Sequence, residues 1–296
     1  MGVLRSNKNV RNMFIAENIS VMGDYFTYVA LVGLVKDATD STFLVSLIYA
    51  AYVLPSFFLS PLAGPIVDRF DRRKTIILIS LLQAACGVGF LFANDSRIWL
   101  AFAAQIAISS LSVVIVPAFG AALPNLVNND EELRQANVLF GSSWGAMVFL
   151  GSAIGGIFSA TFGRTATFGA DIATFLIGGA LVVMIRIPMQ ANRTTEKRER
   201  VRPIADMKEA INVAKKDPVI LALLCSKMTF AVGAGIVSQL AVLASNVFHV
   251  GDAGRGLLIG VRGIGSGLGP IIGARIAGRD MAKLLKVCGF AGLIFS

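Results

Sequence analysis

The sequence is poor in the residues on which most enzymes and disulfide-bonded domains depend. It has one histidine, His249, and three cysteines in 296 residues. Each cysteine lies in an apolar stretch, which predicts small buried side chains and not a disulfide framework or a metal site. The sequence also lacks a Gly-x-x-x-x-Gly-Lys-Ser/Thr loop. A pump driven directly by nucleotide hydrolysis is therefore not indicated.

Charge is scarce as well. Charged residues make up 15% of the chain and hydrophobic residues 55%, with a mean hydropathy of +0.71. An average soluble domain has about 25% charged residues. A core of this size cannot hide so much apolar surface from water, so a soluble domain and a disordered chain are both excluded. The composition predicts a protein of the lipid bilayer.

Apolar runs long enough to cross about 30 Å of hydrocarbon as helices recur along the chain. Their length favours helices over barrel strands, which predicts an all-α membrane protein. The predicted spans are residues 12–35, 41–67, 75–94, 98–129, 135–163, 165–187, 218–247 and 256–276. The first span carries two acids and no cleavage site, so it predicts a retained helix and not a signal peptide. A ninth span begins near Leu284 and is cut off at Ser296, so we expect about eight full helices, part of a ninth and a truncated bundle.

The loop charges predict the orientation. The chain has 27 Lys and Arg against 18 Asp and Glu, a net charge of +9. If the N-terminus is cytoplasmic, 21 of the 27 basic residues lie on the cytoplasmic side, 4 lie outside and 2 lie within spans. Basic residues gather in the cytoplasmic loops of membrane proteins. We therefore expect a multi-pass protein of a cell membrane with its N-terminus inside, and no nucleic-acid partner.

One long polar segment divides the chain. Residues 188–217 follow the sixth predicted span and are rich in basic residues. We expect residues 1–187 to form a six-helix transmembrane bundle, 188–217 a cytoplasmic central loop, and 218–296 a partial second bundle. The basic residues of the loop indicate a topology signal and a solvated linker, and binding to anionic lipid is the alternative.

A glycine, an acid and several arginines follow one another at short intervals at the end of the second span. The residues concerned are Gly64, Asp68, Arg69, Arg72 and Arg73. The segment resembles the signature loop of the major facilitator superfamily, and it lies between spans two and three, as it does in that family. One position departs from the pattern, because Asp71 stands where the family usually has a glycine. A simple basic turn would explain the arginines but not Gly64 and Asp68 at this spacing.

Weaker similarities point to a branch of that family. Short stretches in four spans look like the bacterial exporter branch that includes enterobactin and macrolide exporters. These stretches are Gly23-Asp24, Pro117-Ala118, Arg134 to Asn137 and Asp171 to Phe175. The resemblance covers essentially the whole chain. It implies a monomeric secondary transporter of the bacterial inner membrane, without a cofactor, that exports a small amphipathic molecule (drug, macrolide or siderophore-like) in exchange for protons by alternating access.

Small residues in two spans suggest where the halves meet. Span five contains Gly151, Gly155 and Gly156, and span eight has glycines at similar spacing, which permit close approach of helices. In the resembled family these two helices face each other across the halves and slide during transport. Antiporters of the family usually have proline where Ser152 stands, which weakens the antiporter inference.

Ionisable residues within spans need a partner or a task. Glu17 and Asp24 are seven residues apart, so they lie on one face of a helix, and Tyr28 continues that face. The resemblance implies that span one lines the central cavity, with Asp24 as a site of protonation. The alternative is a structural acid near a helix break at Gly23.

Three further charges lie in the spans. Lys227 lies at a depth close to that of Glu17, and we expect the two to pair as the cavity opens, unless the lysine reaches the membrane interface instead. Arg262 can serve the substrate cavity or the structure, and Asp171 can be a structural or a coupling acid.

Other classes of function have less support. Gly141 to Gly145 match Gly-x-Ser-x-Gly, but Ser143 lies on an apolar helix and not on a strand-to-helix turn, so we do not expect an enzyme. Transport of a lipid such as a lysophospholipid and a truncated, non-transporting remnant remain alternatives.

Overall fold

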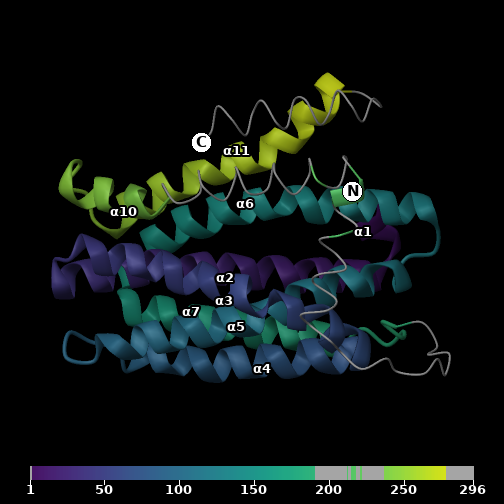
Figure 1. Ribbon diagram of the computed structural model, residues 1–296, viewed down its shortest axis with the longest axis horizontal. Helices are drawn as coiled ribbons and strands as arrows, with labels where there is room; N and C mark the ends of the chain where they lie inside the picture. Colours follow the sequence, from purple (N-terminus) through teal and green to yellow (C-terminus); the bar gives the residue numbers. More distant parts are fainter. Residues whose placement is uncertain (1, 191–211, 213–214, 218–220, 222–236, 278–296) are drawn as a thin grey trace.

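The computed structural model is a bundle of long helices that lie side by side, with neighbours in sequence running in opposite directions (Figure 1). It describes residues 2–190, 212, 215–217, 221 and 237–277. The helices are α1 (Gly2–Ser6), α2 (Lys8–Thr39), α3 (Thr42–Arg69), α4 (Arg72–Leu91), α5 (Ile98–Ala122), η1 (Leu123–Asn125), α6 (Asp130–Phe162), α7 (Arg164–Val183), α10 (Val237–Asn246) and α11 (Asp252–Ala277). Every element of the described residues is helical, which confirms the predicted all-α fold.

Six helices, α2 to α7, are long and apolar enough to cross a membrane within the described part of the chain. They correspond to the first six predicted spans. Polar side chains fix where they begin: Asn7 accepts hydrogen bonds from the first amides of α2, and Asn129 accepts one from the Glu132 amide at 2.9 Å. Asp71 accepts one from the Lys74 amide at 2.9 Å. The residue that departs from the family motif is therefore the N-cap of α4.

Two details differ from expectation. The fourth span was predicted to continue to residue 129, but α5 ends at Ala122 and the short turn η1 follows. Pro124 lies at the start of that turn, where its ring and missing amide hydrogen prevent continuation of the helix. A helix break at Gly23 was the structural alternative for Asp24, and that expectation is wrong because α2 is unbroken from Lys8 to Thr39. Of predicted span seven, the structure describes Val237–Asn246 as α10 and little else.

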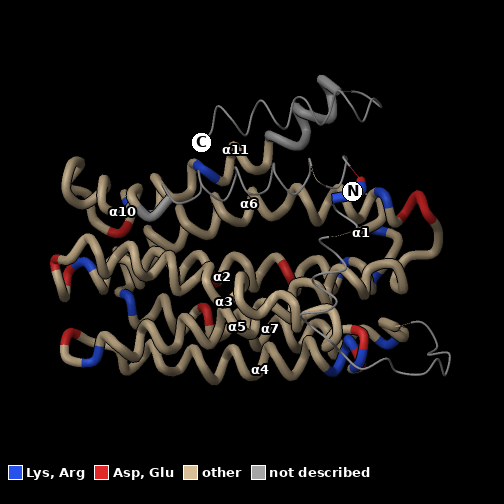
Figure 2. The backbone as a smooth tube through the Cα atoms, in the orientation of Figure 1, with Lys and Arg blue, Asp and Glu red and all other residues tan. Residues whose placement is uncertain are grey.

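Charged residues gather at the two ends of the bundle and leave the middle mostly uncharged (Figure 2). The amino-terminal end carries α1, the α3–α4 junction and the start of α6, and the opposite end carries the α2–α3 and α6–α7 junctions and the start of α11. Nine of the described basic residues that we predicted to be cytoplasmic lie at the amino-terminal end. They are Arg5, Lys8, Arg11, Arg69, Arg72, Arg73, Lys74, Arg134 and Arg186.

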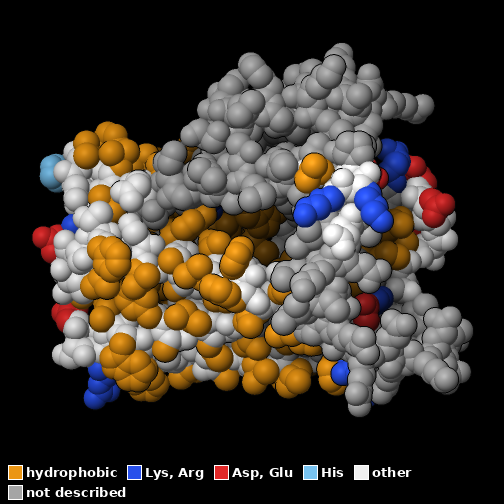
Figure 3. Space-filling model, in the orientation of Figure 1, with side chains coloured by type: hydrophobic (Ala, Val, Ile, Leu, Met, Phe, Trp, Pro, Cys, Tyr) orange, Lys and Arg blue, Asp and Glu red, His pale blue; other side chains and the backbone are white. Residues whose placement is uncertain are grey.

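The side of the bundle is apolar between these ends. Figure 3 shows hydrophobic side chains over much of the described surface. Phe43, Phe57 and Phe58 of α3 are 73%, 75% and 68% exposed, respectively. A surface of this kind is costly in water and favourable against lipid tails. It agrees with the bilayer location that composition predicted.

Helix α2 is central to the packing. It packs against α6 and α7, while α4 packs against α5 and α7, and α3 against α5. Helix α11 lies along α6, at the edge of the bundle far from α4 (Figure 1). Helix α11 is therefore joined to the helices α2 to α7 chiefly through α6.

Helices α6 and α11 touch at backbone level, as expected for spans five and eight. A Cβ atom at Gly263 would lie 2.5 Å from the Gly145 carbonyl oxygen, and one at Gly156 would lie 2.5 Å from the Asp252 carbonyl oxygen. Neither position can hold a side chain unless the helices move apart. Ser152, in place of the family's proline, is fully buried in an unbroken α6.

We predict that Gly263→Ala weakens this contact. The added methyl group would overlap the backbone of α6, and overpacking of this kind costs about 1–3 kcal/mol. Gly265→Ala is the matched control on the same helix, because no atom of the described residues lies within 4 Å of its Cβ position. The midpoint of thermal unfolding in detergent should fall for Gly263→Ala and hold or rise for Gly265→Ala. Equal midpoints for the two variants would contradict the contact.

Candidate transport site

Helix α2 brings two acids into the apolar part of the bundle. Glu17 has a buried carboxyl oxygen, Oε2, without a hydrogen-bond partner among the described residues. Asp24 lies beside Asp171 of α7, close enough for their charges to interact. None of the ion pairs among the described residues includes Glu17, Asp24 or Asp171.

Asp171 differs from the two α2 acids because its carboxylate is satisfied by hydroxyl groups. It is 2% exposed. Its Oδ2 accepts a hydrogen bond from Thr27 at 2.6 Å, and its Oδ1 accepts one from Thr174 at 3.3 Å. A side chain at Gly23 would overlap Asp171 and Thr174, so α2 and α7 approach closely there. These contacts support a structural role for Asp171.

Arg262 of α11 meets the tyrosines of α2. Its Nη2 donates a hydrogen bond to the Tyr25 hydroxyl at 3.2 Å, and its guanidinium carbon lies 5.8 Å from the centre of the Tyr25 ring. Tyr28 and Tyr52 pack edge to face at 6.0 Å, and Arg262 is within electrostatic range of both. The sequence predicted Arg262 and Tyr28 as cavity residues, and the structure brings them together.

Tyr25 and Tyr52 were missed by the sequence analysis. The chain has four tyrosines, two on α2 and two on α3, each pair three residues apart. Residues at this spacing share one face of a helix. That pattern was the available signal, but it did not show that the two faces meet.

A second polar cluster closes the opposite end of the bundle. We call Asp37, Arg164, Asp252 and Arg255 the ion network. Arg164 Nε lies 2.9 Å from Asp252 Oδ2, Arg255 Nη1 lies 2.6 Å from Asp252 Oδ1, and Arg255 Nη2 lies 3.2 Å from Asp37 Oδ1. Arg164 also pairs with Asp37 at 2.5 Å. The network therefore ties α2 and α7 to α11, and it lines a hollow of about 1040 Å³.

The sequence analysis did not predict this network. Arg164 and Arg255 are two of the four basic residues that it counted on the outer side, but it named no acid beside them. Asp252 and Arg255 are almost fully buried, with 7% and 6% of their side chains exposed. Their position just before an apolar span was the only available signal.

The family motif lies at the amino-terminal end, between α3 and α4. Arg72 donates to the Ala121 carbonyl at 2.8 Å and to the Met189 carbonyl at 3.4 Å, and its Nη2 lies 3.7 Å from Asp68. Arg73 donates to the carbonyl of Val183. These arginines therefore hold the ends of α5 and α7. Arg69 and Asp68 close the end of α3, and the Cβ position of Gly64 faces open space.

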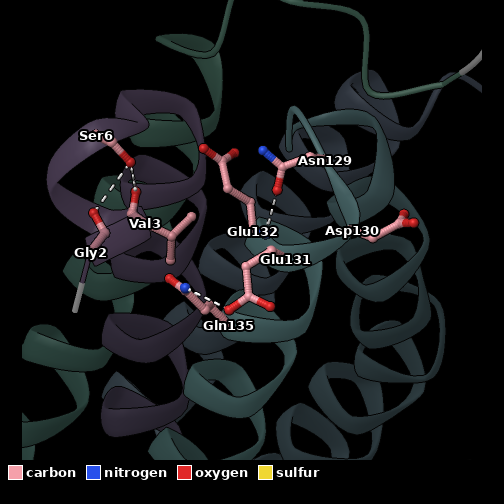
Figure 4. Close-up of a pocket in the computed structure, with 8 residues that line it drawn as sticks. All are labelled: Gly2, Val3, Ser6, Asn129, Asp130, Glu131, Glu132 and Gln135. Atoms are coloured by element: carbon pink, nitrogen blue, oxygen red, sulfur yellow. Dashed lines mark hydrogen bonds between the residues drawn. The ribbon is translucent and has the colours of Figure 1, made fainter.

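A hollow of about 690 Å³ at the amino-terminal end has no sign of a transport role. It lies between α1 and the start of α6, and Figure 4 shows three acids of α6 around it. Glu131 accepts hydrogen bonds from Arg134 and Gln135, and Glu132 accepts two from Asn128. Acids in the first turn stabilise the amino end of a helix, so a capping role explains them.

Two further residues considered in the sequence analysis, Ser143 and His249, form no catalytic pair within the described part of the chain. The Ser143 hydroxyl donates to the Phe140 carbonyl of its own helix at 3.0 Å. His249 lies at the opposite end of the bundle, beside the ion network. Among the described residues, no group of three His, Cys, Asp or Glu could hold a metal ion. Lys227, the predicted partner of Glu17, lies outside the described residues.

Comparison with known proteins agrees with this architecture. Macrolide efflux protein A of Streptococcus pyogenes is 23% identical over 209 residues, which cover 70% of this chain and 51% of that protein. The enterobactin exporter EntS of Citrobacter koseri is 26% identical over 313 residues, which cover 99% of this chain and 69% of that protein. A crystal structure of a mutant of the peptide transporter POT superposes with a TM-score of 0.67 at 14% identity, covering 93% of this chain and 70% of that one.

The chain spans from about half to about two thirds of the length of most curated relatives that it matches. The sequence profile described as the Major Facilitator Superfamily matches residues 13–296. A match of this extent, together with the shared fold and the exporters among the relatives, shows that the chain belongs to the Major Facilitator Superfamily of membrane transporters.

Proposed function

We propose that the chain acts in a bacterial inner membrane as a secondary transporter that exports a small amphipathic molecule in exchange for protons. Its relatives support export, because they include proteins named as efflux protein and exporter. The basic residues at the amino-terminal end support a cytoplasmic N-terminus. The opposite end then faces the outside of the cell.

The acid pair of α2 and α7 carries the proposal of proton coupling. Asp24 of α2 lies within electrostatic range of Asp171 of α7, and none of the ion pairs among the described residues includes either acid. A carboxyl group in such a place is suited to take up and release a proton, because only its neutral form avoids the cost of a buried charge. Asp171 already accepts a hydrogen bond from the Thr27 hydroxyl at 2.6 Å. We therefore assign the moving proton to Asp24, with Glu17 as a second site.

Lys227 enters the proposal only through the sequence. We keep the hypothesis that Glu17 pairs with Lys227 in one state of the transport cycle. The unpartnered Oε2 of Glu17 leaves that carboxylate open to such a partner. Breaking of the Glu17–Lys227 pair and uptake of a proton by Glu17 would then be coupled.

We propose that residues 1–187 rock against residues 218–296, linked by the loop 188–217. The glycine contact between α6 and α11 would act as the sliding surface, with Gly151, Gly155 and Gly156 on the α6 side. Gly151 and Gly155 also lie against Met22 and Phe26 of α2. Movement of α6 would therefore also displace α2, the helix that carries Asp24.

Two polar features would then favour opposite states of the cycle. The ion network would join α2 and α7 to α11 at the outward end. The motif residues Gly64, Asp68, Arg69, Arg72 and Arg73 would form the gate of the cytoplasmic end. Because ion pairs between two bodies must break when those bodies separate, the network favours the state that is closed to the outside.

Asp24→Asn should abolish export driven by a proton gradient, because an amide cannot take up a proton. Efflux of fluorescein, and separately of rhodamine 123, from cells that lack their own exporters measures this, with and without a gradient. Asp40→Asn, which removes a carboxylate exposed at the end of the same helix, is the control and should leave efflux unchanged. Equal efflux by wild type and Asp24→Asn would contradict the assignment of the proton.

Asp252→Asn should shift the population towards the state that is open to the outside. The change removes one carboxylate from the buried Arg255 and the partly exposed Arg164, although Asp37 remains as their partner. Loss of a buried ion-pair partner costs about 3–5 kcal/mol, so we expect at least about 1.4 kcal/mol here, which is a tenfold change in the ratio of the two states. Spin labels at Ser96 and His249 would report the separation of the halves. An unchanged distance distribution would contradict the role of the network.

The contribution of Asp252 should also depend on pH. Burial raises the pKa of this carboxyl, but hydrogen bonds from Arg164 and Ser159 and the charges of Arg164 and Arg255 outweigh burial, so its pKa lies below the ordinary 3.8. A group whose pKa is lowered by folding stabilises the folded state at neutral pH, and this contribution is lost as the pH falls through the lowered value.

The measurement is the difference in thermal midpoint between wild type and Asp252→Asn. It should be the same at about pH 7 and about pH 5 and should shrink as the pH falls below the ordinary carboxyl pKa of 3.8 and through the lowered pKa of Asp252. A difference that is already lost at about pH 5 would mean that another group controls the network.

A further inference from the structure

Arg262, on α11, is a charge without a counterion among the residues that the structure describes. It lies ten residues beyond Asp252, which is about 15 Å of helix from the ion network. None of the ion pairs among the described residues includes it. Its one hydrogen bond goes to the neutral hydroxyl of Tyr25, and its Nε is buried without a partner.

The surroundings of Arg262 are aromatic and offer a second unused polar group. Tyr25 and Tyr28 are each 3% exposed. The hydroxyl of Tyr28 is buried and has no hydrogen-bond partner, although the edge of its ring packs against Tyr52. Two donors from different helices, Arg262 Nε and the Tyr28 hydroxyl, are thus left unsatisfied within one cluster.

Unsatisfied buried donors are costly, and a charged one more so than a neutral one. An anion removes both costs, because a guanidinium and a phenol hydroxyl donate strong hydrogen bonds to a carboxylate or another oxyanion. The tyrosine rings add flat apolar surface on which an aromatic group can pack. A cation would be repelled by the arginine.

We propose that Arg262, Tyr25, Tyr28 and Tyr52 form an anion-binding subsite for an aromatic substrate that carries an acidic group. The proposal deepens the function proposed above, since it names the substrate class of the transport cavity, and it rests on that function for the movement of the bound molecule. The binding itself requires no proton gradient and can be tested separately.

Two dyes that share the xanthene ring system allow a matched test: fluorescein is an anion and rhodamine 123 is a cation. Binding of each to the full chain in lipid nanodiscs is measured by fluorescence polarisation. Arg262→Gln should weaken fluorescein binding by at least about tenfold, as expected for loss of a charge-assisted hydrogen bond, and should not weaken binding of rhodamine 123. Arg97 lies just before α5, outside the subsite. Arg97→Gln removes the same charge there and should change the binding of neither dye.

Two further variants keep the test decisive if Arg262→Gln does not fold. Tyr28→Phe removes only the unpartnered hydroxyl and should weaken fluorescein binding several-fold. Arg262→Lys keeps the charge and should weaken fluorescein binding no more than Tyr28→Phe does. Absence of fluorescein binding to wild type, preference for rhodamine 123, or equal loss of both dyes in Arg262→Gln would overturn the proposal.

The result is independent of the transport assay. If fluorescein binding depends on Arg262 but no proton-driven efflux occurs, the subsite stands and the proposed transport function fails. If proton-driven efflux of either dye depends on Asp24 while fluorescein binding does not depend on Arg262, transport stands and the substrate class is wrong.

Discussion

The backbone contact between α6 and α11 is the constraint on which the rest of the structure depends. Side chains at Gly156 or Gly263 would force these helices apart. Because both positions are glycines, α11 lies close along α6, and only one side of α11 faces the bundle. This orientation of α11 turns Arg262 towards Tyr25. It also places Asp252 against Arg164 and Arg255 against Asp37 of α2. Tight packing of small residues is a main source of helix association where lipid replaces water.

The polar groups inside the bundle divide into two kinds. Asp171 and the ion network have their hydrogen bonds supplied by neighbouring helices, so they fasten helices together. Glu17, Tyr28 and Arg262 each keep a buried polar atom without a partner. Because unsatisfied groups of this kind are rare in folded proteins, they mark the places where a proton or a ligand has a physical reason to bind.

The signature motif illustrates how a departure from a family pattern can be structural. Asp71 replaces a glycine but serves as the N-cap of α4, which fixes where that helix begins. Arg72, one residue later, then reaches the carbonyls at the ends of α5 and beyond α7. The turn is stabilised by local hydrogen bonds, while its arginines tie three helices of the first bundle at one end.

The sequence by itself determined which segments are helices and which family they belong to, since the length of an apolar run and the spacing of Gly64, Asp68 and Arg72 are local properties. It also singled out Glu17, Asp24 and Arg262, because a charge within an apolar run needs a reason. Tertiary structure alone decided which groups meet. Spacing along one helix fixes the face on which a residue lies but not the helix that this face contacts, so Tyr25 beside Arg262 and Asp252 beside Arg164 emerged only from the packing.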